Sequence, residues 1–422
     1  MEIGDAVRML LVLLALMSKS TPAEWQQIRD AAPAELDTAV RSAIQSHFPF
    51  ADELLSGAEL PTRFIDTALR TLSTYDRDRL SLMADALLEW SANSIGYKSG
   101  EFTTPESVRK LIIGLAEPVG SVYDPAAGTG QLIVDAANYI DAAVEHSDAA
   151  HFIGQEVHSG VWAMAQLNLA VHGVHADIAQ GDVFSDDRFP HLRSDRVLAV
   201  PPWNQRLAID ERSKNDPRWI FGEPGPNDGN AAWIQHCLYH LADEGRAVLV
   251  LPTGALFEVG RAGRIRQRII KAGLLDAVIA LPPALFSWTS IPSTVLVFSK
   301  RSAGGSAQPA SLMVDLSDSG DRPSRQTATL ANDLVEEVAE TYRRWTEGKP
   351  PDMENAAVAD FVDIAANDFV IIPARYLPVI HTAPDIEEAK QRKRELLHHL
   401  ETLSAACREA DEQLRKLLGA TR

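Results

Sequence analysis

The middle of the chain alternates between short apolar segments and amphipathic ones, and this alternation limits the possible folds more than any other feature. From about residue 97 the apolar runs are GSVYDP, HFIGQEV, ADIAQGDVF, DRVLAV, GRAVLVLP, LLDAVIALP and STVLVFSK. Helical patterns such as GQLIVDAANYI and VWAMAQLNLAVHG lie between them. The alternation predicts an α/β domain over 97–300 with a largely parallel sheet, whose ligands bind beyond the carboxyl ends of the strands.

The flanking segments predict other structures. Residues 1–96 show helical periodicity without strand-like alternation, so we expect an all-helical N-terminal domain. Residues 301–383 predict a C-terminal extension of mixed secondary structure. Residues 384–422 predict a helix with a seven-residue apolar repeat, which favours a coiled coil over a helix lying on its own domain. The two seams contain Ile386, Leu400, Cys407 and Leu414, and Ala389, Leu396, Leu403, Ala410 and Leu417.

The apolar run from Met9 to Met17 does not predict a membrane span. It has nine residues, too few to cross a bilayer. Glu2 and Asp5 precede it, where a secretory signal would carry positive charge. We therefore expect a buried helix in a cytoplasmic chain. The two cysteines offer neither a disulfide framework nor a zinc spacing, so no metal site is predicted.

The formal net charge of −18 argues against a chain that binds nucleic acid without a partner, because contacts to phosphates dominate such binding. A local basic face or a basic partner subunit would still allow DNA binding. The run GRAGRIRQRIIK, over 260–271, is one candidate for such a face. An ordinary solvated helix face is the more common meaning of such a run.

The segment VYDPAAGTGQLIV contains the first candidate ligand site. A strand ends at Asp124, Gly128 and Gly130 allow a tight turn, and a helix opens after them, where its free N–H groups can meet a ligand. A purely structural turn would look the same. The next strand, however, ends near Glu156, 26 residues past Gly130, where an acid can accept both hydroxyls of a ribose. Asp182, near the end of the following strand, could accept from an adenine amine.

The loop lacks the basic residues that a phosphate site requires, and Asp124 would repel phosphate. A nucleoside without phosphates therefore fits better than NAD or ATP. An acid beside the turn also suits a cationic amino-acid tail. S-adenosylmethionine has both properties.

The motifs DPAAGTG and VPPW, in this order, resemble those of DNA adenine methyltransferases that modify the exocyclic amine. Over 97–380 the chain further resembles the modification subunit of type I restriction systems. The segments GEFTTPESV, GQEVHSGVWAMAQLNLAVHG, LPTGALFEVGRAGRIRQRII, LPPALFSWTSIPSTVLVFSK and ANDFVIIPARYL all have counterparts there. The resemblance implies a Rossmann-like methyltransferase domain that uses S-adenosyl-L-methionine, binds DNA, and pairs with a specificity subunit through the C-terminal helix. Self-association through that helix is a further possibility.

The resemblance also assigns site residues. It places the cofactor against Glu101, Phe102, Thr103, Thr104, Pro105, Glu106, Asp124, Ala126, Ala127, Gly128, Gly130, Glu156 and Asp182. Thr103 stands where the family has an aromatic residue, and Leu132 replaces the usual phenylalanine after the turn. Both changes remove ring contacts and keep the polar groups, so we expect looser packing around the cofactor.

The catalytic loop is assigned to Val200, Pro201, Pro202 and Trp203. In the family it carries Asn-Pro-Pro-aromatic and acts on a base flipped out of the duplex. The ring stacks on the base, while the Asn oxygen and the first Pro carbonyl accept hydrogen bonds from the adenine amine. Val200 has no acceptor, and Asn204 lies beyond Trp203 with no evident way to replace it. Losing one such bond costs about 2.7–4 kcal/mol, or 100- to 1000-fold in rate.

The primary hypothesis is therefore a DNA adenine methyltransferase, slowed by Val200. Two alternatives remain. One is a catalytically degenerate scaffold or regulator that binds cofactor or DNA. The other is a methyltransferase acting on RNA or protein, since a Pro-Pro-aromatic loop suits any planar amine.

Overall fold

The computed structural model describes residues 3–55, 61–94, 104–143, 150–208, 215–300, 310–320 and 328–378, together with four single residues near the C-terminus. The chain divides into two compact units, Met1–Leu377 and Pro378–Arg422. Within the described residues, no helix has both the length and the apolarity that crossing a membrane requires.

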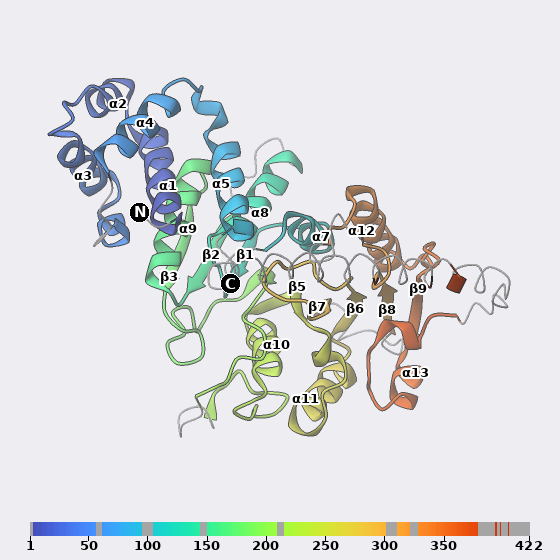
Figure 1. Ribbon diagram of the computed structural model, residues 1–422. Helices are drawn as coiled ribbons and strands as arrows, with labels where there is room; N and C mark the ends of the chain where they lie inside the picture. Colours follow the sequence, from blue (N-terminus) through green and yellow to red (C-terminus); the bar gives the residue numbers. More distant parts are fainter. Residues whose placement is uncertain are drawn as a thin grey trace, which may run out of the picture. The chain divides into compact units, whose positions relative to one another are not determined.

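A mixed β-sheet forms the centre of the first unit (Figure 1). Its strands, within the described residues, are β1 (Ser121–Asp124), β2 (His151–Glu156), β3 (Ala176–Gln180), β4 (Ser194–Ala199), β5 (Leu241–Pro252), β6 (Leu275–Ala280), β7 (Ser293–Ser299), β8 (Ala310–Asp315) and β9 (Ala356–Asp360). Their order is β3-β2-β1-β4-β5-β7-β6-β8-β9. Strands β1 to β5 pair in parallel, whereas β7 runs antiparallel to both β5 and β6.

The strands β1 to β7 coincide with the seven apolar runs of the sequence, so the predicted α/β fold is confirmed. Strands β8 and β9 lie in the segment predicted only as a mixed extension. There β8 pairs in parallel with β6 and antiparallel with β9, which extends the same sheet.

Helices cover both faces of this sheet (Figure 1). They are α7 (Glu106–Ala116), α8 (Gln131–Ala143), α9 (Ser159–His172), α10 (Gly229–Tyr239), α11 (Gly260–Lys271), α12 (Asn332–Thr346) and α13 (Phe361–Ala366). Side chains of successive strand residues alternate between two apolar cores. Val122 joins the core with α7, α8 and α12, whereas Tyr123 joins the core with α10, α11 and α13.

The basic run at 260–271 forms α11. Its apolar residues Ala262, Ile265, Ile269 and Ile270 are buried in the second core. Arg261, Arg264, Arg268 and Lys271 are exposed on the other face. The helix is therefore amphipathic, and its basic face meets solvent.

The N-terminal segment is helical throughout its described residues. It contains α1 (Ile3–Lys19), α2 (Pro22–Arg29), α3 (Leu36–His47), α4 (Thr62–Leu72) and α5 (Leu80–Ser94), with short 3₁₀ turns at Pro49–Leu55 and Arg77–Arg79. Thr21 caps α2, because its hydroxyl accepts from the Glu24 N–H while Glu24 accepts from the Thr21 N–H. The run from Met9 to Met17 lies in α1, and the core it joins includes Leu167 and Val171 of α9.

The predicted C-terminal helix falls outside the described residues apart from Lys393, Arg394, Leu397 and Ser404, which are helical. The coiled coil and the domain boundaries predicted from the sequence therefore remain predictions.

Candidate functional site

A cavity of about 430 Å³ opens at the carboxyl ends of four neighbouring strands. Much of its lining comes from the last residues of β1 and β2 and from the segments that follow β1, β2, β3 and β4. The chain places β2 and β3 on one side of β1, and β4 on the other. The loops after β1 and β4 therefore diverge at this point, which is where open α/β sheets bind their ligands.

Most of the site residues predicted from the sequence lie together in this cavity. Its lining includes Thr104, Asp124, Ala126, Ala127, Gly128, Glu156, Asp182, Val200, Pro201, Pro202 and Trp203. Pro105 and Glu106 are not in the wall; they begin α7, which follows Thr104. Gly130 is not among the lining residues; it directly precedes α8. Glu101, Phe102 and Thr103 fall outside the described residues.

The loop after β1 is held in a tight turn. The Asp124 carboxylate accepts from the N–H of Ala126 at 3.0 Å. Gly128 and Gly130 have φ angles of 54° and 76°, in the left-handed region that favours glycine. Asp124 is buried, and burial raises its pKa to about 7, with the nearby Glu156 carboxylate adding to the rise and the Ala126 N–H opposing it.

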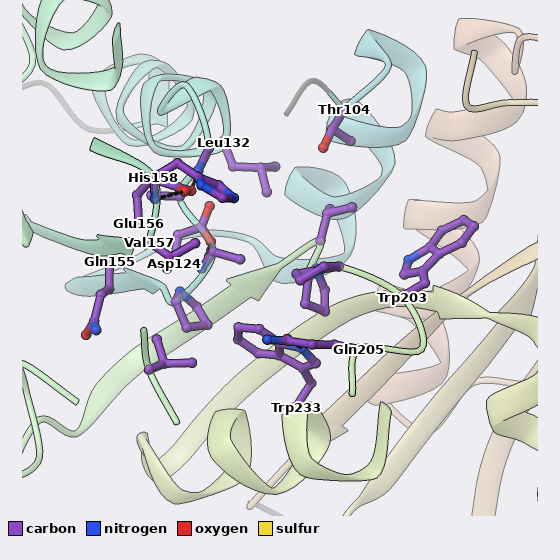
Figure 2. A pocket seen from close by; sticks show the side chains of 18 of the residues that line it. Thr104, Asp124, Leu132, Gln155, Glu156, Val157, His158, Trp203, Gln205 and Trp233 are labelled. Carbon is purple, nitrogen blue, oxygen red and sulfur yellow. Dashed lines mark hydrogen bonds between the residues drawn. The ribbon is translucent and has the colours of Figure 1, made fainter. Parts of the chain in front are cut away.

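Glu156, at the end of β2, ties this turn to the sheet. One carboxylate oxygen accepts from the Gly128 N–H at 3.1 Å. The other accepts from the His158 N–H at 2.8 Å (Figure 2). Burial raises the pKa of Glu156, and the two N–H groups partly offset this. A carboxylate has about four acceptor sites, so two bonds leave capacity for the hydroxyls of a ligand.

Asp182 occupies the matching position after β3. One of its carboxylate oxygens accepts from the Phe184 N–H at 2.9 Å, which keeps the side chain in a local turn. Three carboxylates therefore lie at or just beyond the carboxyl ends of three adjacent strands. Among the described residues that line the cavity there is no lysine, and Arg109 is the one arginine. This balance suits a ligand that carries hydroxyls and a cation, and opposes one that carries phosphates.

The segment after β4 forms the other side of the cavity. Figure 2 shows Asp124, Glu156 and His158 grouped on one side and Trp203 on the opposite side. The Trp203 ring packs 5.0 Å from Phe286 and 4.9 Å from Trp288, measured between centroids. Its indole N–H donates to the Val250 carbonyl at 3.2 Å. The ring is therefore held in place by an aromatic cluster and by β5.

Val200 is half-buried and packs against the apolar core of α7, α8 and α12. Asn204, the nearest amide along the chain, has its side chain engaged. The side-chain oxygen of Asn204 accepts from Asn230 Nδ2 at 2.9 Å. The backbone N–H of Asn204 donates to Asn230 Oδ1 at 3.0 Å. Asn204 therefore forms a paired contact with α10.

Sequence reasoning missed several residues of the wall. Phe286, Trp288, Thr289 and Ile291 come from the loop after β6, and their apolar and aromatic content was a usable signal. Gln205 accepts from the Trp233 indole N–H at 3.1 Å. A Cβ on Gly229 would lie 2.2 Å from the Gln205 carbonyl oxygen, so the close approach of this loop to α10 requires glycine there. Arg109, Gln131, Gln155 and His158 also line the cavity.

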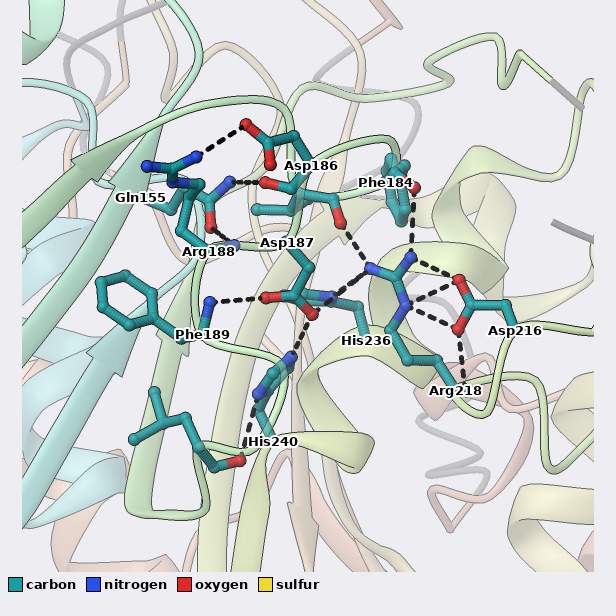
Figure 3. Close-up of polar contacts among 12 residues, drawn as sticks. Gln155, Phe184, Asp186, Asp187, Arg188, Phe189, Asp216, Arg218, His236 and His240 are labelled. Atoms are coloured by element: carbon teal, nitrogen blue, oxygen red, sulfur yellow. Dashed lines mark hydrogen bonds and ion pairs between the residues drawn. The ribbon is translucent and has the colours of Figure 1, made fainter. Parts of the chain in front are cut away.

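A buried polar network adjoins this wall (Figure 3). Arg218 donates to the carbonyls of Val183 and Phe184, and to Nδ1 of His236 at 3.1 Å. Asp216 forms an ion pair with the same guanidinium. Because Val183 lines the cavity, Arg218 fastens the segment before α10 to the cavity wall.

Asp187, His236 and His240 in this network resemble a metal-ligand set, since one donor atom of each lies within 4.8 Å of the others. The ring nitrogens of the two histidines nevertheless already have hydrogen-bond partners. His236 contacts Tyr123 and Arg218, and His240 contacts Asp187 and the Leu192 carbonyl. Burial lowers the pKa of His236 far below its usual range, with His240 and Arg218 adding to the effect, so its Nδ1 accepts from Arg218. We assign these contacts a structural role.

Comparison with known proteins gives concordant matches. The sequence model of the N-6 DNA methylase family matches residues 75–385. The HindI methylase subunit, from a type I restriction enzyme of Haemophilus influenzae, is 29% identical over 349 residues, covering 81% of this chain and 78% of that protein. The MjaIX methylase subunit of Methanocaldococcus jannaschii is 31% identical over 295 residues, covering 67% of this chain and 53% of that protein.

Solved structures share the fold. The methyltransferase subunit of a type I restriction-modification system from Streptococcus thermophilus superposes with a TM-score of 0.72 at 23% identity, covering 84% of this chain and 79% of that one. A chain from a study of complex assembly in the type I system gives a TM-score of 0.70 at 18% identity, with 96% of this chain and 93% of that one covered.

Proposed function

The chain belongs to the N-6 DNA methylase family, and we propose that it is the modification subunit of a type I-like restriction-modification system, which methylates the exocyclic amine of adenine in DNA. The family match over residues 75–385 carries this proposal. It agrees with the sequence-based predictions of family, fold, cofactor and enzyme class, which are confirmed. The chain spans 53% of the length of the Methanocaldococcus subunit, so the activity and partners of a complete subunit belong to the proposal.

The cofactor side of the cavity fits S-adenosylmethionine. When bound, this cofactor supplies an electrophilic methyl group on a sulfonium. Glu156 has acceptor capacity for the ribose hydroxyls, and Asp182 for the adenine amine. Asp124 offers a carboxylate to the cationic tail. The turn at Gly128 leaves the backbone open to close approach, because no side chain stands there.

The side of the cavity built by the loop after β4 receives the target base. An adenine within the duplex is out of reach, so it must be flipped out to enter. Trp203 offers a ring for stacking, and the contacts to Phe286, Trp288 and Val250 hold that ring in one orientation. The prolines fix the backbone so that the Pro201 carbonyl can accept from the adenine amine.

Val200 leaves this pocket without the acceptor that the family's asparagine supplies. The Asn204 side-chain oxygen is already engaged with Asn230, so it does not take over the role. We therefore expect methyl transfer to be slow, because its activation barrier is higher by about 2.7–4 kcal/mol. Cofactor binding is expected to be unaffected, since Asp124, Glu156 and Asp182 are all in place.

The proposal includes partners. DNA binding would use the exposed arginines of α11 together with a specificity subunit, because the formal net charge of −18 opposes binding by the chain alone. The C-terminal helix over 384–422 is the proposed contact to that subunit or to a second copy. A protein that modifies cellular DNA works in the cytoplasm of a prokaryote, where we place this chain.

Transfer of tritiated methyl groups from S-adenosylmethionine to unmethylated DNA tests the proposal. The assay is run with and without an added specificity subunit. Methylation that requires the specificity subunit is the expected result. Cofactor binding without any DNA methylation would favour a catalytically degenerate scaffold, and transfer to RNA or protein in place of DNA would favour the other alternative.

A further inference from the structure

The catalytic loop ends in an unusual backbone conformation. Asn204, which directly follows Trp203, has a φ angle of 54°, in the left-handed region that residues other than glycine rarely adopt. Asparagine enters this region more readily than most residues, but the conformation still has a cost. Such a conformation persists where surrounding contacts impose it, and it is frequent at functional sites. The contacts around Asn204 therefore show what holds the loop in place.

One buried side chain supplies two of these contacts. Asn230, the second residue of α10, is 3% exposed. Its Oδ1 accepts from the Asn204 backbone N–H at 3.0 Å, and its Nδ2 donates to the Asn204 side-chain oxygen at 2.9 Å. The Asn204 N–H shares a rigid peptide plane with the Trp203 carbonyl. Asn230 therefore fixes the backbone that carries the Trp203 ring.

Glu258, in the segment before α11, sets the orientation of the Asn230 amide. Its Oε1 accepts from Asn230 Nδ2 at 3.0 Å, and its backbone carbonyl accepts from Arg266 Nη1, also at 3.0 Å. An ionised carboxylate only accepts hydrogen bonds, whereas a backbone N–H only donates. Glu258 therefore takes the amino end of the amide and Asn204 takes the oxygen end. A reversed amide would lose both of these bonds.

These two residues reach the cavity only through the loop. Asn230 and Glu258 are not among the described residues that line it, whereas Trp203 and Asn204 are. A displacement of about 1 Å at a reacting group can cost about 100-fold in rate, even when the change lies far from the chemistry. A contact that holds the loop from behind is therefore expected to affect the transfer step more than the binding of the cofactor.

We propose that Asn230, oriented by Glu258, is a positioning residue for methyl transfer. It holds the catalytic loop so that the Trp203 ring and the Pro201 carbonyl already face the place of the target base before the base enters. This inference rests on the proposed function. It gives a role to two residues, from α10 and from the segment before α11, to which the sequence motifs assign none.

The first test removes the amide. Asn230→Ala should lower the single-turnover rate of tritiated methyl transfer to DNA about 10- to 100-fold, with the specificity subunit present. The Kd for S-adenosylhomocysteine, the product that the cofactor leaves, should change less than about twofold by calorimetry. Asn355→Ala is the matched control, because it removes a half-buried asparagine whose Nδ2 donates to the Asp315 carbonyl at 2.8 Å, outside the cavity wall. It should leave the rate per folded molecule unchanged.

A spectroscopic measurement follows the loop without any turnover. The eight tryptophans of the chain are replaced by 5-fluorotryptophan, and the fluorine resonance of Trp203 is identified as the one missing from Trp203→Phe. Asn230→Ala should shift or broaden this resonance, because the backbone that carries the ring is released. Asn355→Ala should leave the resonance in place.

A rescue tests the hydrogen-bond network itself. Asn230→Asp brings two carboxylates face to face and should also slow methyl transfer. Asn230→Asp/Glu258→Gln keeps the total charge of the pair and reverses donor and acceptor, while the Asn204 amide can turn its amino end toward the new carboxylate. The double variant should recover most of the lost rate. If Asn230→Ala does not fold, these two variants carry the test.

The outcomes separate the inference from the proposed function. An unchanged rate with an unmoved Trp203 resonance in Asn230→Ala overturns the inference, and so does a double variant no faster than Asn230→Asp. A Kd for S-adenosylhomocysteine that rises as much as the rate falls also overturns it, since Asn230 would then support the whole cavity. A wild-type chain that binds S-adenosylhomocysteine but transfers no methyl group overturns the proposed function, and the fluorine resonance then decides whether Asn230 holds the loop.

Discussion

The pKa of Asp124 leads to a quantitative prediction about cofactor binding. Burial raises this pKa to about 7, so the carboxyl group of the ligand-free protein is about half ionised at neutral pH. A cationic tail binds the ionised form. The apparent affinity is therefore reduced by the ionised fraction, which falls from about one half at pH 7 to about 3% at pH 5.5. We expect the Kd for S-adenosylhomocysteine to rise roughly 15-fold over this interval.

The direction of the effect follows from proton linkage. Binding favours the deprotonated carboxyl, so the complex releases protons, and affinity is lost as the pH falls through the pKa of the free site. The α-amino group of the ligand, with an ordinary pKa near 8, stays charged over this range. Glu156, whose pKa burial also raises, adds an effect of the same sign.

Calorimetry at several pH values between 5.5 and 7, in buffers of different ionisation enthalpy, measures both the Kd and the number of protons released on binding. We expect release of about half a proton per ligand at pH 7 from Asp124. Asp124→Asn should remove most of the pH dependence, whereas the exposed Asp37→Asn should keep it. A constant Kd, net proton uptake, or an unchanged pH profile in Asp124→Asn would refute the reasoning.

The raised pKa of Asp124 also makes the free energy of unfolding depend on pH. Between the unfolded pKa of 3.8 and the folded value of about 7, the folded chain binds the Asp124 proton and the unfolded chain does not. The free energy of unfolding of the ligand-free protein therefore falls as the pH rises through this window, by about 4 kcal/mol for a shift of about three units. Denaturant unfolding of Asp124→Asn should show a correspondingly flatter profile between pH 4 and 7.

The remaining predictions concern the other parts of the site. Glu156→Ala should weaken cofactor binding by at least ~1.5 kcal/mol, measured by calorimetry. Val200→Asn should raise DNA methylation 100- to 1000-fold in the tritium assay. The exposed Val362→Asn, as a control, should leave the rate unchanged. If Val200→Asn binds cofactor but methylates no faster, the pocket is inactive for another reason. Trp203→Ala should lower methylation about 5- to 160-fold in either background, since base stacking worth about 1–3 kcal/mol is lost. Truncation after Pro384 should leave cofactor affinity intact and remove partner or self-association, and an identical sedimenting species before and after would count against the coiled coil.

The sequence predicts the strands and the carboxylates well because both depend on local patterns. Apolar runs mark β1 to β7, and Asp124, Glu156 and Asp182 each lie at or just beyond a strand end, so a parallel arrangement brings them together. The position of β7 between β5 and β6 depends on long-range pairing, which no local pattern reveals.

Other features become visible only in three dimensions. Asn230 looks like any polar residue at the start of a helix, and its bond to Glu258 depends on where the segment before α11 packs. Asn204 stands close to the catalytic loop in sequence, but its engagement with Asn230 depends on where α10 packs. Conversely, the missing acceptor at Val200 is plain from the motif alone, because the backbone position is set by the two prolines that follow.

The packing of α1 against α9 has a consequence for how the molecule unfolds. Leu167 and Val171 of α9 complete the core of the N-terminal helices, while α9 itself follows β2 within the sheet region. Exposing either side chain costs about 1.5–3 kcal/mol. The N-terminal helices therefore cannot detach without a penalty inside the region that binds cofactor. We therefore expect the N-terminal helices and the sheet to melt together in one calorimetric transition, and a ligand bound at Glu156 to raise the melting temperature of both.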